Sequence, residues 1–266
     1  MGILNITPDS FSDGGQFFEP SHAVDHAFEM IREGADILDI GGESSRPGAK
    51  PVSSDTELSR ILPVVKMIRE RSTVPISIDT TKADVAKACL GAGADMINDV
   101  SGLRDSGKEM AEAAHSFGAG LILMHRRGTP ETMQSCADYQ DVVGETVEEL
   151  RASIQLALDY GIKHDRLAID PGLGFAKDTR HNLEVLNRLE AFHRLGYPVL
   201  LGPSRKSFIG EITGKAVEDR DFGTAAVVAV AVLKGVQILR VHNVAAMRDV
   251  IQTTLKICGD RYVRTL

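Results

Sequence analysis

Short apolar segments alternate with longer amphipathic ones along the whole chain. The short segments are rich in Val, Ile and Leu and show no clean polar–apolar alternation, which is typical of strands buried on both faces. They predict eight strands, at Gly2–Ile6, Ile37–Ile40, Ile76–Asp79, Met96–Asp99, Leu121–Met124, Leu167–Asp170, Val199–Gly202 and Ile238–Val241.

Helical periodicity fills the intervals between these segments. Val24, Ala27, Phe28 and Ile31 have the i, i+3, i+4, i+7 spacing of one helix face, and similar stripes run through 58–65, 147–158 and 244–255. The longest apolar block, Thr224–Leu233, is about half the length that a membrane helix needs and predicts a buried helix. Strand and helix alternation of this kind predicts an α/β protein with a parallel sheet.

The ends of the predicted strands distinguish a closed barrel from an open sheet. Nearly every strand ends in or near polar residues: Asn5, Asp39, Asp79, Asn98, Asp99, His125, Asp170, Ser204, Arg240 and His242. An open doubly wound sheet gathers functional groups at one switch point, whereas a barrel brings all its carboxyl ends to one mouth. We therefore predict a (β/α)8 TIM barrel, and one domain spanning residues 1–266 because no linker or low-complexity stretch interrupts the pattern.

Composition narrows the class of partners. Hydrophobic residues make up 43% of the chain and charged residues 25%, which suits a soluble protein with a large core. The net charge of −7 disfavours broad binding to nucleic acid or to an anionic membrane. Three cysteines, Cys89, Cys136 and Cys258, lie far apart and form no CxxC, so we expect reduced thiols. Met1 leads directly into the first strand without a signal-peptide pattern, so we expect a cytoplasmic protein.

Two loops after early strands have unusual compositions. The loop after the first strand, residues 5–15, has the composition of an ordinary Pro/Gly-rich surface turn, but it contains Phe11 among polar residues, which suggests a ligand contact as the alternative. The loop after the second strand combines glycines with Ser45 and Arg46, which offer hydrogen-bond donors to an anion. A helix-entry turn with a solvated arginine explains the second loop equally well.

Acceptor side chains end three of the inner strands. Asp79, Asn98 and Asp170 are each compatible with a structural role, but three acceptors at one mouth favour a ligand rich in N–H groups, such as an aminopyrimidine. Paired carboxylates also suit acid–base hydrolysis or a metal, although asparagine is a poor metal ligand and no histidine cluster accompanies them. The sixth strand continues into a glycine-containing loop, where Phe175 suits the wall of a site for a flat ring; the loop lacks the third glycine of a dinucleotide fingerprint.

Cationic residues follow the last two strands. Ser204 is a predicted N-cap, and Arg205 and Lys206 in the following turn oppose the helix dipole unless a negative ligand binds there. Strand alternation places Arg240 and His242 on the same face, where they can clamp a pyrophosphate. The alternative interpretation of Arg240 is an ion pair with Asp39 or Asp79.

Taken together, eight segments resemble the dihydropteroate synthase family. The matching segments are GILNITPDSFSDGG, DILDIGGESSRPG, ISIDT, INDVSG, MHRRGTP, DPGLGFAK, GPSRKSFIG and RVHNV, which occur in order across residues 2–244. The resemblance implies a transferase of folate biosynthesis that joins (7,8-dihydropterin-6-yl)methyl diphosphate to p-aminobenzoate with release of diphosphate. It also implies inhibition by sulfonamides, a homodimer and a Mg2+ cofactor.

Carried over to this sequence, the resemblance implies specific roles. Asn5 would bind the Mg2+. The pterin diphosphate would contact Ser45, Asp79, Asn98, Asp170, Lys206, Arg240, Val241 and His242. The p-aminobenzoate site would contain Phe11, Pro47, Phe175, Lys206 and Ser207. Catalysis would depend on Lys206, Arg240, His242, Asp79 and Asp170.

The implied reaction is an SN1-like loss of pyrophosphate, in which Mg2+, Arg240 and His242 stabilise the leaving group. The sequence departs from the family where Ser45 replaces a usual threonine, Arg126 a common methionine and Asn243 a frequent aspartate. Two alternatives share the pterin-binding residues. A pterin-dependent methyltransferase of the same superfamily has no use for the SRKSF segment, and a non-catalytic pterin-binding protein would lack the pyrophosphate cations.

Overall fold

The computed structural model describes residues 1–7, 20–46 and 48–259. It contains a strand at each of the eight predicted places, and the two near the C-terminus are shorter than expected. The strands are β1 Gly2–Asn5, β2 Leu38–Gly41, β3 Ile76–Asp79, β4 Met96–Asp99, β5 Gly120–Met124, β6 Leu167–Asp170, β7 Leu200–Leu201 and β8 Ile238–Leu239.

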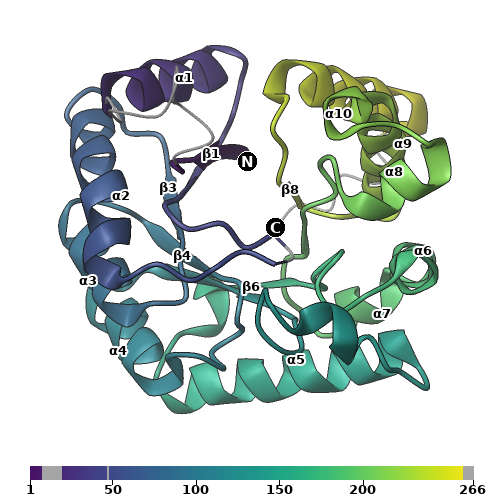
Figure 1. Ribbon diagram of the computed structural model, residues 1–266, viewed down its shortest axis with the longest axis horizontal. Helices are drawn as coiled ribbons and strands as arrows, with labels where there is room; N and C mark the ends of the chain where they lie inside the picture. The colour runs from purple at the N-terminus through teal and green to yellow at the C-terminus, as the bar shows by residue number, and fades with distance from the viewer. Residues whose placement is uncertain (8–19, 47, 260–266) are drawn as a thin grey trace.

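The strands form a closed parallel barrel. β1 to β6 pair in chain order, and β7 pairs with β8. Two isolated bridges complete the ring, Ile169 to Val199 between β6 and β7, and Gly2 to Val241 between β8 and β1. Figure 1 shows the strands around a central space with helices outside them. The predicted TIM barrel is confirmed.

Helices follow the strands and cover the outside of the barrel (Figure 1). They are α1 Pro20–Arg32, α2 Ser54–Arg69, α3 Ala83–Gly91, α4 Gly107–Phe117, α5 Val142–Asp159, α6 Thr179–Asn187, α7 Glu190–His193, α8 Ser207–Thr213, α9 Asp221–Leu233 and α10 Val244–Cys258, with short 3-10 turns at Met133–Cys136, His164–Arg166 and Val217–Asp219. Gly118 ends α4 with φ of +61°, a left-handed conformation that glycine adopts without steric cost and that turns the chain back into β5.

Strand alternation separates two apolar layers. Outward residues such as Ile76 and Ile78 belong to the large core between the strands and the helices. Ile122, Ala168 and Leu200 form a smaller cluster. These strand residues alternate with the outward ones, so their side chains face the inside of the barrel. Ala168 is two residues before Asp170, so both side chains are on one face of β6. The polar strand ends therefore lie above a small apolar layer.

The helix α9 differs from its prediction. It contacts α10 closely and buries Thr224, Val228, Ala231 and Val232. Val230 and Leu233 nevertheless remain 40% and 44% exposed. The prediction that this apolar block is a buried helix is therefore wrong for one of its faces. None of the described helices is both long and apolar enough to span a membrane.

Candidate active site

Acceptor side chains gather at the carboxyl ends of β2, β3, β4 and β6. Asp39, Asp79, Asn98 and Asp170 are all buried. In the strand register Asp79 lies beside Asn98, and the Asn98 amide donates a 3.2 Å hydrogen bond from Nδ2 to Oδ2 of Asp39. Oδ1 of Asp170 accepts a 2.7 Å hydrogen bond from the Gly172 N–H. The barrel thus brings the three predicted acceptors to one mouth and adds Asp39 to them.

Arg240 is the cation that balances two of these carboxylates. Its Nε donates to Oδ2 of Asp39 at 2.5 Å and its Nη2 to Oδ2 of Asp79 at 2.6 Å. The sequence left open an ion pair of Arg240 with Asp39 or Asp79, and the structure contains both ion pairs. Burial raises the pKa of Asp79 above its ordinary value, and the Arg240 charge opposes that rise. Arg240 therefore pairs with both buried carboxylates at once.

Two buried acceptor atoms in this cluster have no hydrogen-bond partner among the described residues, Oδ1 of Asp39 and Oδ1 of Asn98. Buried polar atoms in native proteins are nearly always hydrogen-bonded, because an unpaired one loses its hydration without compensation. A ligand that supplies N–H groups would satisfy both atoms. This observation supports the interpretation of the mouth as a binding site.

A cation and an aromatic ring also lie at this mouth, near Asp170. Nζ of Lys206 lies 4.2 Å from the centre of the buried Phe175 ring, a cation–π contact. Burial lowers the pKa of Lys206 to about 8 and raises that of Asp170 to about 6. The loop that carries Phe175 passes so close to β5 that a Cβ on Gly172 would lie 1.9 Å from the His125 carbonyl oxygen, so only glycine fits there.

His242 and Ser204 connect the loops after β8 and β7. Nδ1 of His242 lies 2.8 Å from the Ser204 hydroxyl, which also accepts the His242 backbone N–H at 3.2 Å. If the hydroxyl hydrogen is donated to Nδ1, the imidazole carries its own hydrogen on Nε2. The prediction of Ser204 as an N-cap is wrong, because α8 begins at Ser207 and Ser204 binds His242 instead.

The surroundings of His242 favour the neutral imidazole, whereas the sequence interpretation used a cation. Burial lowers its pKa to about 3, with a further contribution from the nearby Arg240 charge. A neutral imidazole still donates one hydrogen bond. The sequence also predicted that the Arg205 cation would oppose the dipole of the following helix. This unfavourable charge is offset, since Arg205 pairs with Asp221.

The remaining predicted site residues have different surroundings. Asn5 is half-buried at the end of β1, and Ser207 is exposed at the start of α8. Val241 lies in the barrel wall, where its side chain belongs to the core and both backbone groups bond to the β1 segment. The contact of Val241 with the pterin diphosphate stays a prediction. Phe11 and Pro47 lie outside the described residues.

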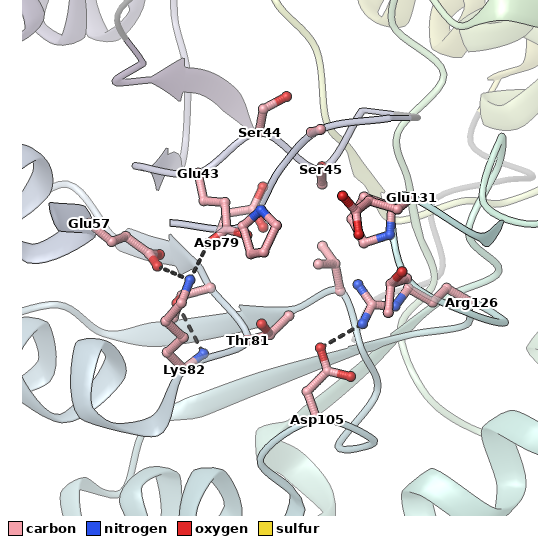
Figure 2. Close-up of a pocket in the computed structure, with 16 residues that line it drawn as sticks. Glu43, Ser44, Ser45, Glu57, Asp79, Thr81, Lys82, Asp105, Arg126 and Glu131 are labelled. Carbon is pink, nitrogen blue, oxygen red and sulfur yellow. Dashed lines mark hydrogen bonds and ion pairs between the residues drawn. The ribbon is translucent and has the colours of Figure 1, made fainter. Parts of the chain in front are cut away.

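Ser45 lines a pocket that it shares with Asp79. Figure 2 shows the pocket, with Lys82 linked to Glu43 and Glu57 on one side. On the other side, Nη2 of Arg126 donates to Oδ2 of Asp105 at 2.6 Å (Figure 2). The pocket therefore extends the mouth between the loops after β2 and β5.

Two of the family departures acquire a structural explanation. Arg126 is buried and neutralised by Asp105, so its charge does not act alone in the mouth. Asn243 caps α10 by accepting the Ala246 N–H, and its Nδ2 donates to Oδ2 of Asp221 at 3.0 Å. A carboxylate at position 243 would face the Asp221 carboxylate.

One buried cation near the site was not selected from the sequence. Lys177 donates to carbonyl oxygens of Gly172 and Phe175, and its Nζ lies 2.8 Å from Nδ1 of His125. Burial lowers the pKa of Lys177 to about 7. Its position at the end of the glycine-containing loop is the only sequence signal for it, because its partner His125 is 52 residues away.

Comparison with known proteins connects this geometry to a family. The model of the pterin binding enzyme family matches residues 1–242. Dihydropteroate synthase of Synechocystis sp. is 47% identical over 251 residues, which cover 94% of this chain and 86% of that protein. The chain belongs to the dihydropteroate synthase family of pterin-binding enzymes.

Solved structures of the family have the same fold. The Xanthomonas albilineans dihydropteroate synthase with 4-aminobenzoic acid is 42% identical, with a TM-score of 0.90 over 97% of this chain and 92% of that one. The Yersinia pestis dihydropteroate synthase in a sulfonamide drug complex is 40% identical, with a TM-score of 0.90 over 95% of this chain and 91% of that one. Both agree with the barrel and with the family membership.

Proposed function

We propose that the chain is a dihydropteroate synthase that condenses (7,8-dihydropterin-6-yl)methyl diphosphate with p-aminobenzoate to give 7,8-dihydropteroate and diphosphate. The observation that carries this proposal is the pair of unpartnered buried acceptors, Oδ1 of Asn98 and Oδ1 of Asp39, beside Asp79 and Asp170. The amino and ring N–H groups of a pterin are the donors that such a cluster lacks.

The reaction breaks the bond between the pterin methylene carbon and the diphosphate oxygen, and the electron pair leaves with the oxygen. The neutral amine of p-aminobenzoate then attacks the methylene carbon and loses a proton. An aniline nitrogen is a weak nucleophile, so departure of the leaving group is the demanding step. We propose an SN1-like path in which the buried carboxylates Asp79 and Asp170 stabilise the pterin cation.

Arg240 and His242 would hold the departing diphosphate. Arg240 has five N–H donors and uses two of them on Asp39 and Asp79. The others can bind diphosphate oxygens as charge develops, and Nε2 of His242 can donate a further hydrogen bond. A diphosphate beside His242 would also raise the pKa of the imidazole, which burial and nearby cations lower in the described state.

A Mg2+ ion fits the donor set only with help from the substrate. Asn5 offers one amide oxygen at the end of β1, and the described residues contain no group of three or more His, Cys, Asp or Glu side chains suited to a metal. Mg2+ prefers oxygen and is commonly held by one or two protein ligands with water and substrate phosphates. Asn5 would hold it, and the ion would neutralise charge on the diphosphate.

The side of the mouth with Phe175 and Lys206 would bind p-aminobenzoate, with Ser207, Phe11 and Pro47 completing the site. Sulfonamides, which resemble p-aminobenzoate, would compete for it. The Lys206 cation over the Phe175 ring suits an aromatic carboxylate, because the ring can stack and the ammonium can pair with the negative charge.

The exposed apolar face of α8 and α9 supports the expected homodimer. It comprises Ile212, Phe222, Val230 and Leu233, which are 56%, 92%, 40% and 44% exposed. We expect Leu233→Glu to shift the mass measured by light scattering from dimer to monomer. Leu183→Glu is the matched control, since Leu183 is 46% exposed on α6. A wild-type monomer would contradict the dimer.

The direct test of the proposed function supplies the protein with Mg2+, the pterin diphosphate and labelled p-aminobenzoate. We expect labelled dihydropteroate and its loss in Asn98→Leu, which lacks the pterin acceptor. Thr146→Val is the control, because its hydroxyl is also buried without a partner but lies in the outer helix α5. An inactive wild type, or an Asn98→Leu variant as active as Thr146→Val, would contradict the proposal. A methyltransferase would instead transfer a methyl group to a corrinoid, and a binding protein would show no turnover.

A further inference from the structure

The residue immediately before Lys206 has an unusual backbone conformation. Arg205 has φ of +56°, in the left-handed region that residues with a Cβ rarely adopt unless their surroundings hold them. Its N–H donates to Oγ1 of Thr224 at 3.1 Å, and its carbonyl oxygen accepts from Nη1 of Arg220 at 3.1 Å. Both contacts come from the start of α9.

Asp221, the first residue of α9, provides the charged part of this arrangement. Its Oδ1 accepts from Nε of Arg205 at 2.7 Å and its Oδ2 from Nη2 at 3.0 Å, a bidentate pair that fixes direction as well as distance. Oδ2 also accepts from Nδ2 of Asn243 at 3.0 Å. Asn243 directly follows His242, so Asp221 joins the loop after β7 to the loop after β8.

We infer that Asp221 is a positioning residue, which acts through Arg205 to hold the left-handed turn that directs Lys206 and Ser207 toward the p-aminobenzoate side of the mouth. The inference rests on the proposed function. Lys206 extends from this turn as far as the Phe175 ring, 4.2 Å from its centre, so a change at Arg205 shifts the ammonium relative to the ring.

The arrangement predicts an unequal effect on the two substrates. The pterin is read chiefly by the strand ends of β3, β4 and β6, which Asp221 does not contact. The p-aminobenzoate side depends on Lys206 and Ser207, which directly follow Arg205. The pterin diphosphate shares Lys206, and Asp221 also contacts Asn243 beside His242, but most of the residues assigned to the pterin diphosphate lie outside this turn. Loss of the Asp221 charge should therefore raise the KM for p-aminobenzoate more than the KM for the pterin diphosphate.

The test compares Asp221→Asn with the exchange variant Asp221→Asn/Asn243→Asp. We expect Asp221→Asn to raise the KM for p-aminobenzoate about tenfold or more, the scale on which small misplacements act, and the KM for the pterin diphosphate by less than about threefold. The exchange variant moves the carboxylate across the same 3.0 Å hydrogen bond and should recover most of the loss. The control is Arg188→Gln, which breaks ion pairs to Asp141, directly before α5, and to Glu184 on α6.

A second measurement does not depend on activity. Trypsin cleaves after Arg205 and Lys206 once the turn opens, so we expect faster cleavage at these two bonds in Asp221→Asn than in wild type or Arg188→Gln. Unchanged KM values and unchanged cleavage would overturn the inference, as would an equal KM rise in Arg188→Gln or no recovery in the exchange variant. An inactive wild type would refute the proposed function, while the cleavage rates would still decide the role of Asp221.

Discussion

Replacement of Arg240 by alanine would remove the only cation that directly contacts Asp39 and Asp79 among the described residues. Two unit charges about 4 Å apart attract each other by about 4 kcal/mol at an effective dielectric constant of about 20. Part of that attraction offsets the desolvation of the groups. Loss of one partner from a buried ion pair typically costs about 3–5 kcal/mol, because the remaining charge stays buried. We expect Arg240→Ala to lose this amount of unfolding free energy and to remain folded, since a domain has about 5–15 kcal/mol.

The same variant should lose turnover about 100-fold to 1000-fold, the usual effect of removing a donor to a developing anion. Urea unfolding followed by circular dichroism measures the first effect, and product formation measures the second. The double variant Asp39→Asn/Arg240→Ala separates them, because it removes one of the two stranded charges. We expect it to recover about half of the lost stability and none of the turnover.

The stability deficit of Arg240→Ala should depend on pH. Burial already raises the pKa of Asp79, and loss of the Arg240 charge removes the main opposing effect, so the folded state binds more protons than the unfolded state. Its stability then rises as pH falls toward the ordinary carboxyl pKa of about 4. A deficit below about 1 kcal/mol at pH 8, or turnover restored in the double variant, would refute the assigned role of Arg240.

Other variants test the remaining parts of the mouth. Lys206→Ala should lower turnover at least about 100-fold while the circular dichroism spectrum of the barrel stays unchanged. Phe175→Leu should raise the KM for p-aminobenzoate about tenfold by loss of the stacking and cation–π contact, with little effect on pterin binding measured by calorimetry. Burial raises the Asp170 pKa from 3.8 to about 6, so this group costs stability above pH 4 and the full cost is reached above pH 6. At pH 8 the free energy of unfolding of Asp170→Asn should therefore be higher than that of wild type by up to about 3 kcal/mol, so the variant should unfold at a higher temperature. It should at the same time lose pterin binding. A lower melting temperature would show that the protein stabilises the Asp170 carboxylate.

The barrel could be predicted because its signals are local. Most strands are short Ile-, Val- or Leu-rich segments that end in or just before polar residues, and both properties can be read within a few consecutive positions, as in Ile76–Asp79. The shape of the ring then brings the polar ends together without any further information. The convergence of Asp79, Asn98 and Asp170 follows from the fold alone.

The features that were missed depend on partners distant in sequence. Ser204 has the local pattern of an N-cap, but His242, 38 residues later, binds its hydroxyl. The charge of His242 depends on burial and on neighbouring cations, which no local pattern contains. The apolar segment of α9 predicts burial, yet Val230 and Leu233 remain exposed although α8 and α10 pack against this helix.

Arg240 illustrates how two competing interpretations of a residue can both apply. The sequence left open a diphosphate clamp and an ion pair with Asp39 or Asp79, and the ion pairs are observed. Those pairs hold the guanidinium at the mouth in a fixed orientation, and they use only two of its five N–H groups. A diphosphate can then bind the remaining donors with little reorganisation, which is the condition under which a charged group stabilises a transition state most effectively. In the proposed function, the carboxylates that pair with Arg240 are therefore what positions it for the leaving group.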